Sequence, residues 1–109
     1  MSNFSESPVA ELADLFRLLG DTTRMRIVLS CLKAPIAVSD IASSLDISQT
    51  LASHHLRLLR AARIVTADRQ GKQVFYFASD RHISRMISDM LEHIEEPDQE
   101  IDWPRKTST

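Results

Sequence analysis

Four residues near the C-terminal end of the chain carry side chains that bind divalent metal ions. They are Asp80, His82, His93 and Glu96, and carboxylate oxygens and imidazole nitrogens are common zinc ligands. In an α-helix, the eleven steps from His82 to His93 make three turns plus about 20°, so both imidazoles share one face. Glu96 lies one turn further on, and Asp80 can bend in beside His82 from the helix cap. The spacing therefore predicts a metal site on the last helix.

A single copy of this helix cannot close such a site. His82 and His93 lie ~16 Å apart at a rise of ~1.5 Å per residue, whereas the ligands of one zinc ion lie within a few ångströms of one another. The midpoint of residues 82 and 93 is 87.5, and that of residues 80 and 96 is 88. A twofold axis near that point brings Asp80 and His82 of one chain against His93 and Glu96 of another, twice. We therefore expect two identical intersubunit sites per homodimer.

The ligand types narrow the choice of metal. Two imidazoles and two carboxylates without a thiolate suit four-coordinate zinc, with cobalt(II) as a substitute in vitro, and disfavour copper(I). Because the histidines must be neutral to bind, affinity should fall below about pH 6. An apolar stripe beside the ligand face suits the dimer contact and comprises Ile83, Met86, Ile87, Met90, Leu91 and Ile94.

A second set of polar and basic side chains suits DNA. The segment after Ser48 is predicted to be a helix, and the N-terminal half of a recognition helix meets base edges in the major groove. Gln49 can form paired hydrogen bonds with adenine. The expected base-reading residues are Gln49, Thr50, Ser53 and His54, with Arg57 and Arg60 on phosphates and Arg69 and Lys72 on the backbone or minor groove. The residues expected on or near the inward side are Leu51, Ala52, His55 and Leu56.

The elements that position these residues follow from periodicity and capping. Helical spacing and capping residue types predict helices over residues 9–19, 23–33, 40–45, 49–62 and 81–95, with Asp21 or Thr22, Ser39, Ser48 and Asp80 as caps. Runs of β-branched and aromatic residues predict strands over 64–67 and 74–77, with a hairpin tip at 68–72. A helix-turn-helix followed by a hairpin with a basic tip predicts a mainly α (α+β) winged helix-turn-helix. We expect one such domain over residues 9–96, between tails at 1–8 and 97–109, that dimerises through its first and last helices.

Composition limits the possible function classes. The 109 residues suit one domain with an ordinary 43% of hydrophobic residues. The net charge is -2, but residues 49–73 carry five basic side chains against one acidic, so one face can be positive. The sequence has no stretch of 18 apolar residues and no signal-like start, which predicts a cytoplasmic protein without a membrane partner. A single cysteine, Cys31, excludes an intrachain disulfide and is predicted to be a buried small hydrophobe.

Three segments together resemble the ArsR/SmtB family of metal-responsive repressors, over about residues 9–96. The segments run from Leu18 to Ile27, from Ile47 to Leu56 and from Arg69 to Lys72. The resemblance implies a metal-free dimer on near-palindromic double-stranded operator DNA, released when zinc binds. The quartet on the last helix resembles the zinc site of the family's zinc-sensing branch.

Two positions depart from the family pattern. The Cys-x-Cys of the family's other common site corresponds to Ala37 and Ser39, which argues against a thiolate site for arsenic, cadmium or lead. The glycine usual after the recognition helix is replaced by Arg63, which costs left-handed backbone freedom or adds a phosphate contact.

Three other functions remain open at this stage. One is a winged-helix regulator without a metal response. Another is a pure metal buffer, which is disfavoured because it would not need the DNA-reading residues. The third is a zinc enzyme, which is disfavoured because four protein ligands leave no open position for water. We therefore expect no catalysis and no small organic substrate.

Overall fold

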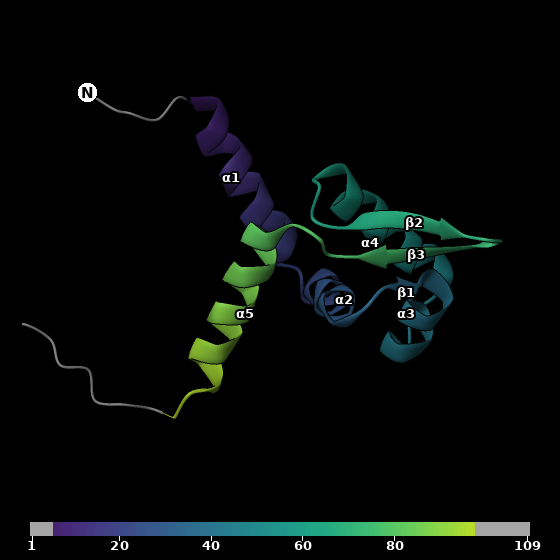
Figure 1. Ribbon diagram of the computed structural model, residues 1–109. Coiled ribbons are helices and arrows are strands. Elements are labelled where there is room, and N and C mark those ends of the chain that lie inside the picture. Colours follow the sequence, from purple (N-terminus) through teal and green to yellow (C-terminus); the bar gives the residue numbers. More distant parts are fainter. Residues whose placement is uncertain (1–5, 98–109) are drawn as a thin grey trace, which may run out of the picture.

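The computed structural model describes residues 6–97 and has the winged helix-turn-helix fold that the sequence predicts (Figure 1). Its elements in chain order are α1 (Glu6–Leu19), α2 (Thr22–Lys33), β1 (Ile36–Ala37), α3 (Val38–Leu45), α4 (Gln49–Ala61), β2 (Thr66–Gln70), β3 (Gln73–Phe77) and α5 (Arg81–Glu95). Helices α3 and α4 form the helix-turn-helix, and β2 and β3 form the wing. The first helix begins at Glu6, earlier than the expected residue 9. Most of the expected C-terminal tail lies outside the described residues.

Side-chain caps fix the start of three helices. At the start of α2, the side chain of Asp21 accepts a hydrogen bond from the backbone N–H of Arg24. At the start of α4, the side chain of Ser48 accepts one from the backbone N–H of Leu51. Asp80 caps α5 in the same way. These caps satisfy backbone donors that the first turn leaves free. The expected cap at Ser39 is wrong, because α3 starts at Val38 with Ala37 in the cap position and no side-chain cap.

The sheet has one strand more than the sequence predicts. Strand β1 pairs antiparallel with β3, with Ile36 opposite Tyr76, and the strand order is β1-β3-β2. Two residues are too few to show an alternating pattern, so periodicity could not reveal β1. The wing also extends further than predicted, because pairing of β2 with β3 continues to Gln70 and Gln73. The tip shortens to Gly71 and Lys72, and Gly71 has the positive φ of 64° that the turn requires.

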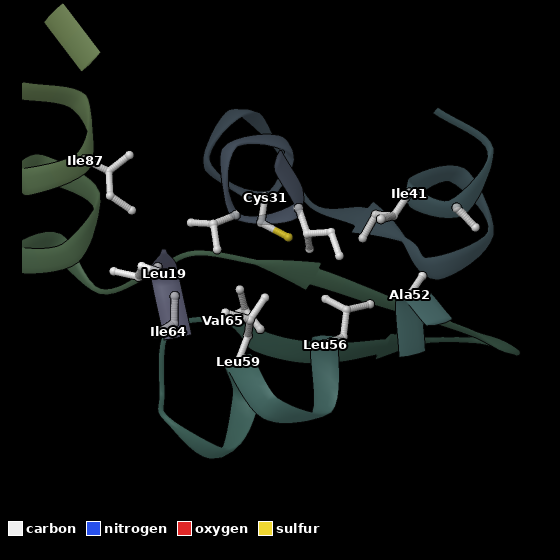
Figure 2. Packing of buried hydrophobic residues seen from close by; sticks show 12 residues of the cluster. Leu19, Cys31, Ile41, Ala52, Leu56, Leu59, Ile64, Val65 and Ile87 are labelled. Atoms are coloured by element: carbon white, nitrogen blue, oxygen red, sulfur yellow. The ribbon is translucent and has the colours of Figure 1, made fainter. Parts of the chain in front are cut away.

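The core lies where α2, α3 and α4 meet the base of the wing (Figure 2). Helix α4 contributes Leu56 and Leu59, both with no exposed surface, and α2 contributes Ile27. From α5, Ile87 is buried at the edge of the same cluster. This burial supplies most of the driving force for folding and holds α4 against the domain.

Helices α1 and α5 lie together on one side of this core, away from the tip of the wing (Figure 1). We call these two helices the arm. No helix within residues 6–97 is long and apolar enough to cross a membrane.

Arg63 lies just after α4 with φ of 61°, which confirms the left-handed geometry expected there. Its backbone N–H donates to the carbonyl of Arg60 at 2.9 Å, and Ile64 N–H reaches back to Leu59 at 2.9 Å. The chain changes direction at Arg63, and Ile64 and Val65 are therefore buried in the core directly after the helix. A residue with a Cβ atom is sterically strained in this left-handed region of positive φ.

Arg63→Gly should therefore stabilise the protein by about 1 kcal/mol, because glycine adopts positive φ freely. Urea denaturation would measure the change. Arg63→Ala is the matched control, since it removes the guanidinium but keeps the Cβ, and its free energy of unfolding should stay close to that of the parent. An equal gain in both variants would attribute the effect to charge and contradict the backbone explanation.

Candidate DNA interface and metal site

Helix α4 presents one face to the core and the other to solvent. Ala52, His55, Leu56 and Leu59 are buried, as the helical period predicts for the first three of them. The expected DNA-contacting residues of this helix are exposed, and they are Gln49, Thr50, Ser53, His54, Arg57 and Arg60. The exposed row is continuous along one face and combines hydrogen-bonding groups near the N-terminus with cations further along. That order suits base edges first and phosphates second.

The expectation that Leu51 points inward is wrong. Its side chain is 40% exposed, while the next residue, Ala52, has no exposed surface. At the start of α4 it is therefore Ala52, and not its neighbour Leu51, that faces the core. Leu51 therefore joins the exposed surface, where an apolar group can contact a thymine methyl.

The wing adds two cations at a distance from α4. Lys72 lies in the turn, and Arg69 lies in β2 opposite Val74; both are exposed. The hairpin projects from the domain (Figure 1), so these side chains are free to approach a DNA backbone beside the major groove.

A buried polar contact joins α4 to the start of α2. His55 is only 8% exposed, and its Nδ1 lies 3.4 Å from a terminal nitrogen of Arg24. Burial and then the neighbouring guanidinium lower the pKa of His55, an effect that Asp21 partly opposes. The hydrogen bond from the Arg24 backbone N–H lowers the pKa of Asp21. Sequence reasoning gave His55 an inward position but did not identify its partner.

The four proposed metal ligands occupy the two ends of α5. At the N-terminal end, Oδ1 of Asp80 accepts hydrogen bonds from the backbone N–H groups of His82 at 2.8 Å and Ile83 at 3.1 Å. Both capping bonds use the same oxygen, so capping leaves Oδ2 for a metal ion. His82, His93 and Glu96 are exposed. The donor set and its accessibility fit zinc.

Within residues 6–97 of one chain, no three histidine, cysteine, aspartate or glutamate side chains gather as a metal-binding group. His82 lies in the first turn of α5 and His93 in its last. The four side chains therefore lie in two pairs at opposite ends of α5 and do not meet within one chain.

Within residues 6–97, the arm leaves a large apolar surface that the rest of the chain does not cover. Met90 is 54% exposed and Ile94 71% exposed. Five of the six residues of the expected stripe, all but Ile83, line a groove of about 430 Å³ together with Phe16 and Leu19 of α1. On α1, Val9, Leu12 and Phe16 are also exposed. Sequence reasoning assigned the first helix to the dimer contact but did not single out these residues, although their helical spacing was visible.

Comparison with known proteins finds relatives that are all named as transcriptional regulators. A sequence family described as "Bacterial regulatory protein, arsR family" matches residues 21–67. A transcriptional repressor SmtB homolog from Synechocystis is 31% identical over 81% of this chain and 67% of its own length. A cadmium resistance transcriptional regulatory protein CadC homolog from Staphylococcus aureus is 36% identical over 76% of this chain and 69% of its own length. The relatives are named as repressors and regulators, not as enzymes, in agreement with the expected lack of catalysis.

Among solved structures, a similar fold occurs in a homodimeric winged helix-turn-helix DNA-binding domain from Mycobacterium bovis, a possible ArsR-family transcriptional regulator. The two structures share a TM-score of 0.76 and 21% sequence identity, over 87% of this chain and 91% of that domain. At this identity the likeness concerns the fold.

Cys31 takes no part in either site. It is 2% exposed, and burial raises the pKa of its thiol to about 12.

Because the thiolate is the reactive form, the native protein at pH 8 should react with a thiol reagent such as 5,5′-dithiobis(2-nitrobenzoate) far more slowly than the protein unfolded in guanidinium chloride. Absorbance of the released thiolate measures both rates, and comparable rates would contradict a buried, protonated Cys31.

Proposed function

Since the chain belongs to the ArsR family of bacterial regulatory proteins, we propose that it is a transcriptional repressor that binds operator DNA as a metal-free homodimer and is released when zinc binds. The observation that carries the proposal is the placement of Asp80 and His82 at one end of α5 and His93 and Glu96 at the other. The same helix leaves an apolar face open to a second copy.

The dimer is supported by the exposed surface of the arm. Apolar patches of this extent on a small domain usually mark an interface. Leu91 and Ile94 near the C-terminal end of α5 and Phe16 on α1 are exposed in one chain, and a twofold contact of the arm would bury them against the same residues of a second copy. The homodimeric relative from Mycobacterium bovis has the same fold, and this agrees with such an assembly.

The metal sites follow from the antiparallel pairing of two α5 helices. With a twofold axis near residue 88, each end of the paired helices combines Asp80 and His82 of one chain with His93 and Glu96 of the other. These two imidazoles and two carboxylates would hold a zinc ion there, and its positive charge would keep the four side chains together. Two relatives carry names that refer to metal resistance or to the SmtB repressor, which supports a metal response.

DNA binding places the two α4 helices of the dimer in successive major grooves. Gln49, Thr50, Ser53 and His54 would read base edges, and Leu51 would contact a thymine methyl. Arg57 and Arg60 would bind phosphates, while Arg69 and Lys72 would reach the flanking backbone or minor groove. These assignments make the operator nearly palindromic, with half-sites about one helical turn apart.

Coupling between the two functions would pass through the packing of α5. Ile87 anchors α5 to the core that also holds α4. When the four ligands are held together across the dimer, the angle between the two arms becomes fixed, and the spacing of the α4 helices follows it. DNA release then requires only that the fixed angle disfavours the spacing of the operator.

Disruption of the arm should weaken the dimer. Ile94→Glu places a charge in the proposed interface, and because burying an unpaired charge is costly, the dimer dissociation constant should rise roughly tenfold or more. Sedimentation equilibrium of the metal-free protein would measure it. Ser88→Glu adds the same charge to the opposite side of α5 and should leave the dimer intact; equal weakening by both variants would argue against this interface.

Zinc should bind with a stoichiometry of two ions per dimer at pH 7.5 and lower the affinity for DNA by about fivefold or more. The duplex would first be selected from a random pool with the metal-free protein, and anisotropy of the labelled duplex would report binding. His93→Ala should bind DNA without metal like the parent and remain bound in zinc.

His54→Ala removes a histidine outside the quartet and should keep the parental zinc stoichiometry. DNA binding by the parent that is indifferent to zinc would leave a winged-helix regulator without a metal response. Release of His93→Ala by zinc, equal to that of the parent, would place the sensing site elsewhere.

A further inference from the structure

Arg24 connects three helices through one side chain and its own backbone. Its backbone N–H donates to Oδ2 of Asp21 at 3.0 Å, at the cap of α2. Its Nε donates to the carbonyl of Leu18 at 2.7 Å, in the last turn of α1. A terminal nitrogen lies 3.4 Å from Nδ1 of His55 on α4. The end of the arm, the start of α2 and the recognition helix therefore meet at one guanidinium.

The chemistry of this contact defines the state of His55. A guanidinium has only donors, so Nδ1 of His55 must accept with a lone pair and the ring proton must reside on Nε2. A protonated imidazole has no lone pair to offer and would bring a second positive charge against Arg24. Because His55 is 8% exposed, water cannot easily separate the two charges.

We propose that Arg24 and His55 are positioning residues that hold the recognition helix at a fixed orientation to α1, and that they do so only while His55 is neutral. The proposal rests on the DNA-binding function proposed above. Protonation of His55 would loosen α4 from the end of the arm and lower the affinity for DNA. Neither residue belongs to the exposed row of α4 or to the metal quartet.

The groups around His55 determine the direction of the pH effect. Arg24 and Asp21 face it from the start of α2, and His54 is its neighbour on α4. Burial and Arg24 lower the pKa of His55 below its ordinary value of 6.5, against the opposing effect of Asp21. The folded protein therefore binds fewer protons at this site than the unfolded chain. The contact contributes its full stability above pH 6.5, and that contribution falls as the pH drops through the lowered pKa.

His55→Gln is the decisive variant, because an amide oxygen can accept from Arg24 and does not titrate in this range. Affinity for the selected duplex would be measured between pH 5.5 and 8 with a chelator present, for the parent and the variant. Both should bind alike at pH 7.5. At pH 5.5 the parent should lose more affinity than the variant, because protonation of His55 removes the lone pair that accepts from Arg24.

His54→Gln is the matched control for the loss of an imidazole. Because His54 is assigned to a base contact, only the ratio of the variant's affinities at pH 5.5 and pH 7.5 is compared, and this ratio should stay close to that of the parent. Identical pH profiles for the parent and His55→Gln would overturn the proposal. Weak binding by His55→Gln at every pH, with a normal unfolding transition, would also overturn it, because a neutral acceptor alone would then be insufficient.

Urea unfolding without DNA tests the contact separately from the proposed function. The free energy of unfolding of the parent should fall relative to that of His55→Gln as the pH drops below 6.5. A constant difference would overturn the contact itself. The pH-dependent difference in the free energy of unfolding could also appear when neither the parent nor the variant binds DNA at pH 7.5. That result would contradict the proposed repressor function and support the contact between Arg24 and His55.

Discussion

The packing of α4 against α2 and α3 is the interaction from which the other properties of the domain follow. Ala52, Leu56 and Leu59 have no exposed surface, so rotation of α4 about its axis would expose apolar side chains and bury polar ones. Because the buried face of α4 is held by the core, the opposite face must point to solvent. The exposed row from Gln49 to Arg60 lies on that opposite face. The placement of Ile64 and Val65 directly after the helix strengthens this constraint from its C-terminal end.

The arm contrasts with this well-packed body. Along α5 only Ile87 is buried, and the C-terminal half of the helix from Ser88 to Glu95 is exposed in one chain. Such a helix gains its tertiary stabilisation on association. A signal that acts on the arm would therefore act where the chain is least constrained by its own core.

Much of this architecture could be predicted from local residue types. Ser48 and Asp80 were recognised as caps because a short oxygen-bearing side chain stands directly before a helical period. Ser39 has the same character but lies inside α3, since the chain passes from β1 straight into the helix. Strand β1 itself was invisible, because its two residues are defined by pairing with β3 and not by their own pattern.

The contacts within the site were harder to predict than its composition. The spacing of the four ligands on α5 is a property of one helix, so the sequence was sufficient to place them on it. Leu51 and Ala52 are neighbours at the start of α4, and helical spacing alone did not decide which of the two would be buried. The contact of Arg24 with His55 joins residues 31 positions apart, and only the tertiary fold brings them together.

Asp80 caps α5 and would also be a ligand in the proposed metal site, and these two requirements together restrict the residues that position 80 can tolerate. The start of α5 favours serine, threonine, aspartate or asparagine, whereas a zinc site accepts cysteine, histidine, aspartate or glutamate. Aspartate is the one residue common to both sets. Any other residue at this position would therefore weaken either the first turn of α5 or the proposed metal site.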